Sequence, residues 1–192
     1  MEEPNLQRAA VFIDIGYFGK VLKYCFDEPR IDFEKFSDYL CEDKERLRTY
    51  VYDCPPYVSQ EPTDEEERRQ ENHERFASSL TKLHRFEVRL GKTAHNAVTG
   101  EFYQKRVDVL LTVDLMRMAW DRQIGTAILV TGDSDFVPVI ESVKQAGVVV
   151  KLFYRDCYDN QGRAMTRTLD ELLEVCDECI VIDNALIEDS AF

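Results

Sequence analysis

The sequence predicts an α/β fold, a three-layer domain with a mostly parallel central sheet in the strand order 3-2-1-4-5. Strand-like and helix-like segments alternate along the chain, which is typical of βαβ units. The run 126–131 is apolar throughout its interior, as expected of a strand buried on both faces of a sheet. In this order, strands one and four are neighbours where the strand order reverses, and open α/β sheets bind ligands there.

The first half of the chain divides into strands and helices at residues that favour caps and breaks. Asp32 is an expected N-cap, and Thr63 forms a capping box with Glu66 three residues later. Prolines at 55 and 56 end a strand, because proline removes a backbone donor. These signals predict strands at 9–15, 47–53 and 85–90, and helices at 17–26, 33–41 and from 64 to about 83.

The second half is expected to hold the other strands of the sheet. Asn96 and Gly100 suit turns, so 91–102 is predicted to be an irregular loop or a hairpin. Ser134 is the expected N-cap of the helix that follows the strand at 126–131, and Gly147 is its expected C-cap. The remaining elements are predicted as helices at 107–120 and 167–176, and strands at 148–154 and 180–183.

Length and composition favour a single domain that spans residues 1–192. The chain is 44% apolar, and it has no apolar run of the roughly 18 residues that a membrane helix needs. Six scattered cysteines and an acidic start without a secretory signal predict reduced thiols. We therefore expect a cytoplasmic protein with no membrane partner.

Charge is distributed unevenly along the chain. The net charge of −13 argues against a protein that coats nucleic acid non-specifically. Residues 168–192 hold eight acids and no lysine or arginine, so 166–192 is interpreted as a helix with an acidic tail. Two stretches are locally basic, one with Arg89, Lys92, Lys105 and Arg106, the other with Lys151, Arg155, Arg163 and Arg167. These stretches are either solvated loops or sites for an anionic ligand.

Carboxylates gather at the predicted carboxyl edge of the sheet. Asp14 ends the first strand, and Asp133 and Asp135 follow the fourth. Asp108 lies in the first turn of a helix, and Asp114 lies about 120° further around that helix, so one of these two is a ligand and the other a supporting or surface acid. Each acid alone is compatible with a cap or turn. Together they favour a Mg²⁺ or Mn²⁺ site, because clustered carboxylates repel one another and hard oxygen ligands suit these ions.

The chain contains four motifs: Val-Phe-Ile-Asp at 11–14, Lys-x-x-Asp-x₅-Asp at 105–114, Thr-Gly-Asp-x-Asp-Phe at 131–136 and Gly-Val-Val-Val at 147–150. Together these motifs resemble the NYN domain family, and within it the LabA/DUF88-like branch. The resemblance spans about 9–155 and implies a PIN-like fold with Mg²⁺- or Mn²⁺-dependent ribonuclease activity. It matches Asp14, Asp108 and Asp133 to the catalytic, metal-binding acids, and Asp114 and Asp135 to the wider metal-binding set.

The residues and the resemblance together predict a metal-dependent endoribonuclease that takes RNA as its substrate. Lys105, which matches a lysine of the family, is expected to contact phosphate together with Arg106 and Lys92. Three further residues complete the expected substrate-binding set: Thr131, Ser134 and Tyr17. A homo-oligomer or a protein partner is left open.

Two alternatives follow from the same residues. Tyr17 stands where the family usually has Asn, and this departure and the negative charge motivate a catalytically weak or inactive regulatory or binding module. The assumed strand order is also shared in type by flavodoxin-like receiver or nucleotide-binding domains, which bind phosphate donors or flavin. Metal binding and RNA cleavage distinguish these possibilities.

Overall fold

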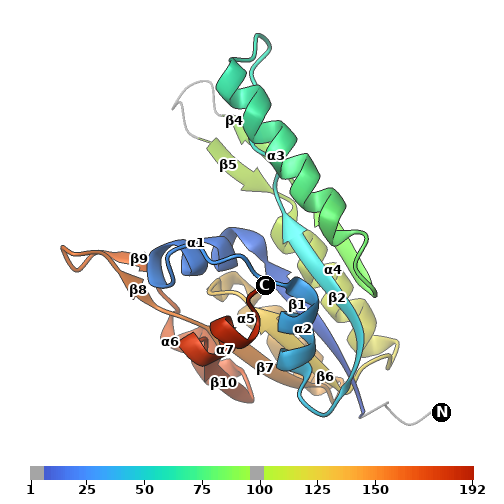
Figure 1. Cartoon of the computed structure of the whole chain (residues 1–192). Coiled ribbons are helices and arrows are strands. Elements are labelled where there is room, and N and C mark those ends of the chain that lie inside the picture. Colours follow the sequence, from blue (N-terminus) through green and yellow to red (C-terminus); the bar gives the residue numbers. More distant parts are fainter. Residues whose placement is uncertain (1–6, 96–101) are drawn as a thin grey trace.

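A six-stranded parallel sheet forms the centre of the protein (Figure 1). The computed structural model describes residues 7–95 and 102–192. The strand order is β10-β7-β6-β1-β2-β3, and every pairing in this sheet is parallel. The predicted order 3-2-1-4-5 is confirmed, and β10 extends it next to β7. The strands are β1 (Arg8–Asp14), β2 (Glu45–Asp53), β3 (Phe86–Leu90), β6 (Thr126–Val130), β7 (Val149–Tyr154) and β10 (Glu178–Val181).

Helices cover both faces of the sheet, which gives the predicted three layers (Figure 1). On one face, Phe12 and Leu129 pack against α4 (Val107–Trp120), α5 (Val137–Gln145) and α6 (Asp170–Val175). On the other face, Val11 and Ile128 pack against α1 (Ile15–Cys25), α2 (Phe33–Cys41) and α7 (Asn184–Asp189). Neighbouring residues of one strand serve opposite layers because side chains alternate along a strand. The helix predicted at 167–176 is shorter than expected, and α7 was not predicted.

Most predicted helix caps are confirmed. The Asp32 Oδ1 atom accepts hydrogen bonds from the backbone N–H groups of Glu34 and Lys35. The capping box of Thr63 and Glu66 begins α3 (Asp64–Leu80). The prediction that Ser134 is a cap is wrong, because Asp133 accepts from the Asp135 N–H at 2.9 Å and caps the 3₁₀ turn η1 (Ser134–Phe136) that precedes α5.

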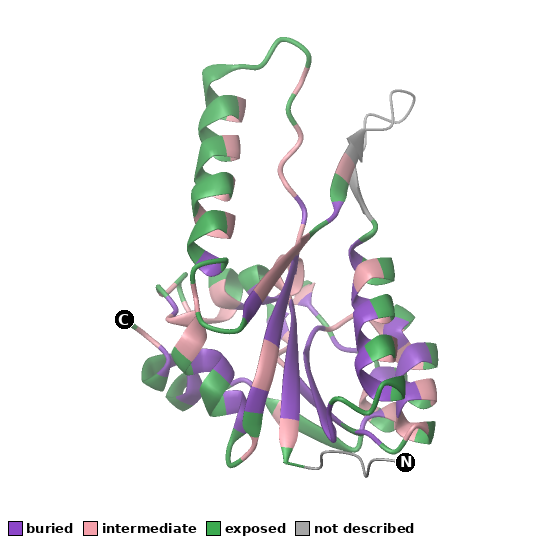
Figure 2. Ribbon diagram, turned by 90° about the vertical axis from the view of Figure 1, so that its right-hand side faces the viewer, coloured by how far each residue is buried: buried purple, intermediate pink, exposed green. Residues whose placement is uncertain are grey.

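Two segments project from the body of the protein (Figure 2). The first is α3, a polar helix on which only Leu80 is buried. It is tied to the sheet where His73 Nε2 lies 3.1 Å from Asp53 Oδ2 at the end of β2. The second is the antiparallel hairpin of β4 (Lys92–His95) and β5 (Phe102–Lys105), which confirms the hairpin alternative for this region. The turn expected at 96 and 100 lies outside the described residues.

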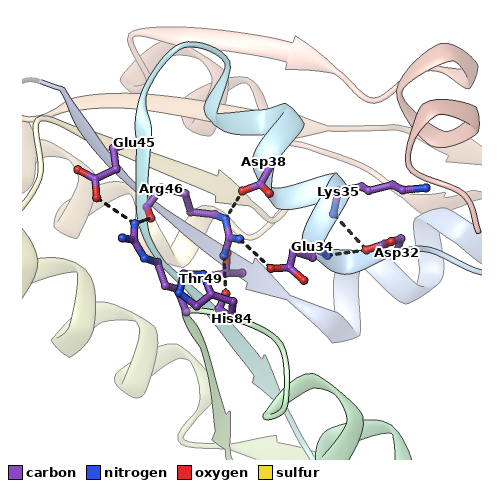
Figure 3. A network of polar contacts seen from close by, with 9 residues as sticks. Asp32, Glu34, Lys35, Asp38, Glu45, Arg46, Thr49 and His84 are labelled. Carbon is purple, nitrogen blue, oxygen red and sulfur yellow. Dashed lines mark hydrogen bonds and ion pairs between the residues drawn. The ribbon is translucent and has the colours of Figure 1, made fainter.

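A buried arginine fastens α2 to the sheet (Figure 3). Arg46 of β2 donates from Nε to Asp38 of α2, and from Nη1 to Thr49 and to the His84 carbonyl. Its guanidinium lies 5.2 Å from the ring centre of Phe86. Only 7% of Arg46 is exposed, and a charge so buried is stable only when its donors are satisfied. The network therefore holds α2, β2 and the start of β3 in one arrangement.

A short hairpin and a disulfide follow β7. β8 (Cys157–Tyr158) and β9 (Ala164–Thr166) pair antiparallel, and Cys157 is bonded to Cys25 at the end of α1. The prediction of six reduced thiols is therefore wrong for these two residues. Their sequence separation of 132 leaves no spacing signal, because only the fold brings them together. This bridge also removes the support that reduced thiols gave to a cytoplasmic location.

No helix among the described residues is long and apolar enough to cross a membrane.

Removal of the disulfide is expected to destabilise the fold. The Cys25→Ala/Cys157→Ala variant should lose about 2–5 kcal/mol of unfolding free energy, because the bridge closes a long loop of the unfolded chain. Urea unfolding measures this loss, and Cys179→Ser, at an exposed thiol, is the matched control. Reductant should destabilise the wild type but not the double variant. Thiol titration of the denatured, unreduced protein should find four thiols, and a count of six would contradict the bridge.

Candidate active site

Two of the predicted acids lie across one crevice at the carboxyl edge of the sheet. Asp14 is the last residue of β1, and Asp133 follows β6 after a two-residue turn. β1 and β6 are paired neighbours, with Ile13 opposite Val130, so the two aspartates lie at adjacent strand ends. Both line a cavity of about 400 Å³, together with Gly16, Tyr17, Lys20, Gly132, Met165, Thr166 and Arg167.

Neighbouring carboxylates help to raise the pKa of two acids at this edge, Asp14 and Asp108. Burial raises the pKa of Asp14 to about 6, and the negative charges of Asp108 and Asp133 add to that increase. Burial is also the largest cause of the raised pKa of Asp108, and the negative charges of Asp133 and Asp135 increase it further. Four of the five predicted acids therefore interact electrostatically, as the sequence suggested.

Asp14 also has a structural task. Its Oδ1 atom accepts a hydrogen bond from the Tyr17 N–H at 3.1 Å and caps the N-terminus of α1. This bond and that of the Gly16 N–H lower the pKa of Asp14, but burial outweighs them. One carboxylate oxygen is thus used by the helix.

The donor chemistry of these acids fits a hard divalent cation. Carboxylate oxygens are the ligands that Mg²⁺ and Mn²⁺ prefer, and repulsion among several carboxylates is relieved when such an ion binds. Within the described part of the chain, no three histidine, cysteine or acidic side chains already form a ligand group for a metal. The fit therefore rests on the chemistry of the donors rather than on a preformed cage.

Asp114 belongs to a different set of contacts. Its Oδ2 atom accepts from Arg89 Nε at 2.9 Å and from the Tyr52 hydroxyl at 3.2 Å, and its Oδ1 atom accepts from Arg117 at 3.0 Å. The residue is 5% exposed and is not among those that line the cavity. These three donors make Asp114 a link between α4, β2 and β3.

The expected phosphate contacts lie at the base of the β4–β5 hairpin. Lys92 and Lys105 are register partners across the hairpin, and Arg106 directly precedes α4, the helix that carries Asp108. Lys92 and Arg106 are exposed. The Lys105 side chain lies outside what the structure describes. The hairpin base therefore brings positive charge to the Asp108 side of the acidic cluster.

Of the remaining predicted site residues, Tyr17 lines the cavity, whereas Thr131 and Ser134 are not among its lining residues. Thr131 is buried, and its Oγ1 atom accepts from the Asp133 N–H at 3.2 Å. Ser134 is the first residue of η1 and is half-buried. The Tyr17 hydroxyl accepts from the Arg155 N–H at 2.9 Å and donates to the Arg155 carbonyl at 3.2 Å. Tyr17 thereby joins α1 to the end of β7.

Tyr17 and Gly132 fit each other closely. A Cβ atom at Gly132 would overlap the Tyr17 ring, 3.0 Å from Cδ2 and nearer still to Cε2. The large ring at position 17 therefore requires a glycine in the turn that presents Asp133.

Six lining residues were absent from the predicted site: Gly16, Lys20, Gly132, Met165, Thr166 and Arg167. Arg167 belonged to the second basic stretch, which was a usable signal. Two other cations of that stretch form ion pairs elsewhere, since Lys151 pairs with Glu178 and Arg163 with Asp159. Lys20 and Met165 carried no signal in the sequence.

An open parallel sheet with facing carboxylates at the switch point defines an α/β protein with an acidic ligand crevice. The family model of the NYN domain matches residues 8–183, and the chain belongs to this family. The fold is similar to the crystal structure of a protein of unknown function from Vibrio parahaemolyticus, with a TM-score of 0.58, 21% identity and 100% of both chains covered. No curated protein matches the chain.

The Tyr17–Gly132 fit predicts strong coupling between the two positions. Gly132→Ala should destabilise the protein by about 1–3 kcal/mol, because the new methyl group collides with a fixed ring. In a Tyr17→Asn background the same change should cost much less, and a thermal-unfolding double-mutant cycle measures the difference. Gly19→Ala on α1 is the control, since its Cβ meets nothing within 4 Å. Additive effects at 17 and 132 would contradict the fit.

The raised pKa of Asp14 predicts that Asp14→Asn increases the free energy of unfolding, and that this increase depends on pH. Ionised Asp14 disfavours the folded state because its pKa of about 6 in the folded protein exceeds the ordinary aspartate value of 3.8. In metal-free buffer the variant should be more stable than wild type by about 2–3 kcal/mol above pH 6, and this gain should vanish below about pH 4. Asparagine preserves the helix cap. Urea unfolding across this range is the measurement, and a gain independent of pH would refute the assignment.

Proposed function

We propose that this NYN domain protein is a Mg²⁺- or Mn²⁺-dependent endoribonuclease of the LabA/DUF88-like branch, within the PIN-like nucleases. The observation that carries the proposal is the cluster of interacting carboxylates at the carboxyl ends of β1 and β6, where burial and like charges raise the pKa of Asp14 to about 6. Such a cluster disfavours folding unless it has a cationic partner, and basic side chains lie on the adjoining hairpin.

Asp14, Asp108 and Asp133 are the residues that would hold the metal, with Asp135 assisting from the start of η1. When bound, the ion supplies Lewis acidity to a phosphodiester and lowers the pKa of water. Lys92 and Arg106, with Lys105 beside them, offset the charge of the RNA backbone. Thr131 keeps the Asp133 turn in place through its hydrogen bond to the Asp133 N–H. We assign Asp114 to support of α4, because three donors already occupy its oxygens.

A second candidate is a catalytically weak or inactive NYN module that binds RNA or a protein. The observation that favours it is the Tyr17 hydroxyl, which is bonded to the Arg155 backbone on both its donor and acceptor sides. Tyr17 stands where the family usually has Asn, and a hydroxyl engaged in this way does not orient water in the crevice. Cytoplasmic location remains a prediction under either candidate.

Cleavage of single-stranded, structured and transfer RNAs with Mn²⁺, against EDTA, tests the nuclease proposal. Asp133→Asn should lower the cleavage rate by about two orders of magnitude, because a charged metal ligand is lost. Asparagine also caps helices well, so η1 should persist. Asp121→Asn, at the exposed end of α4, is the matched control and should cleave as the wild type does.

Mn²⁺ calorimetry separates the outcomes of that experiment. A folded protein that binds Mn²⁺ through Asp133 but cleaves no RNA in the panel would favour the inactive module. Absence of both binding and cleavage at millimolar Mn²⁺ would overturn the metal-dependent nuclease.

A further inference from the structure

Two cations line the acidic cavity on the side of α1 and β9. Lys20 lies on α1, four residues after Gly16, and Arg167 directly follows β9. Both side chains are exposed, and among the residues that the structure describes neither forms an ion pair. They line the same cavity as Asp14 and Asp133, so they lie beside the proposed reaction centre. Neither cation is ion-paired with these two carboxylates.

The fold fixes the position of Arg167. The residue before it, Thr166, donates from Oγ1 to the Arg155 carbonyl at 2.8 Å. The residue after it, Thr168, donates its N–H to Asp156 Oδ1 at 2.8 Å. The Cys25–Cys157 bridge also ties the β8–β9 hairpin to α1, the helix that carries Lys20. The backbone around Arg167 is therefore ordered before any ligand binds, which lowers the entropic cost of binding an anion.

Positive charge thus lies on two sides of the carboxylates. Lys92 and Arg106 stand at the base of the β4–β5 hairpin, next to the start of α4 and Asp108. Lys20 and Arg167 stand on the α1 and β9 wall, next to Asp14. In Figure 1 the two hairpins lie on different sides of the body. An extended polyanion that contacts both sets must cross the acidic cluster between them.

We propose that Lys20 and Arg167 form a subsite for a backbone phosphate next to the scissile one, on a single RNA strand that crosses from one hairpin to the other. This inference rests on the proposed nuclease function and extends it. A strand held on both sides of the carboxylates is cut at an internal phosphodiester. Arginine and lysine suit this task because phosphate contacts position a nucleic acid without reading its sequence.

The test measures binding of a short labelled oligouridylate by fluorescence anisotropy across a series of salt concentrations, in Mg²⁺ buffer. All variants carry Asp133→Asn, so that the probe is not cleaved. Lys20→Gln and Arg167→Gln should each weaken binding by roughly three- to tenfold and lower the slope of log K against log salt by about 0.7, the value for one lost phosphate contact on a single strand. Arg167→Lys should retain the slope.

Two variants provide matched controls for charge. Lys23→Gln alters the same helix as Lys20, at a lysine that lies over the Tyr24 ring. Arg163→Gln alters the same hairpin as Arg167, at an arginine paired with Asp159. Both controls should bind the probe as the parent does. Thermal unfolding of every variant shows that each is folded.

The outcomes separate this inference from the function on which it rests. If Lys20→Gln and Arg167→Gln match their controls while the wild type cleaves RNA, the subsite is wrong and the nuclease stands. If the parent binds no oligouridylate and the wild type cleaves no RNA, both are overturned. A loss confined to Lys20→Gln and Arg167→Gln supports the subsite.

Discussion

The rest of the structure depends on the parallel pairing of β1 with both β2 and β6. This strand is buried along its whole interior and brings the two halves of the chain into one sheet. After β1 the chain turns into α1 on one face, and after β6 it turns into η1 and α5 on the other. The departing chains diverge to opposite faces, so they leave a crevice between them, and the first polar residues beyond the strands line it.

The same geometry places a conflict at Asp14. Its carboxylate satisfies a backbone donor at the start of α1, yet burial and neighbouring acids disfavour its charge. A residue chosen for stability alone would cap the helix without the charge, as asparagine does. Retention of an unfavourable carboxylate beside other carboxylates is typical of sites where stability is reduced for a function. The surrounding sheet, which is stabilised by buried groups such as Arg46, keeps the fold intact despite the unfavourable charge of Asp14.

The features that the sequence predicted are those with local causes. The caps at Asp32 and Thr63 bond to residues two or three positions away, and the strand at 126–131 is marked by its own apolar character. The prediction of a cap at Ser134 was wrong because Asp133 and Ser134 are both residue types that cap helices well. The 3₁₀ turn begins at Ser134, and this makes Asp133 the cap. Helical geometry separated Asp114 from Asp108, but its donors on β2 and β3 come from distant positions. The disulfide partners could not be predicted for the same reason, since 132 positions separate them along the chain.

The bridge between Cys25 and Cys157 also has a topological consequence. It closes a covalent ring that contains β2 through β7, including both projecting segments, α3 and the β4–β5 hairpin. Exposed, projecting segments are where proteases cut first. A single cut within the ring opens it without dividing the protein, so the two pieces stay joined until the bridge is reduced. The segments most accessible to proteases therefore lie between the two disulfide-bonded cysteines. After a cut in either segment, the disulfide still holds β1 and β6, the strands that border the crevice, in one molecule.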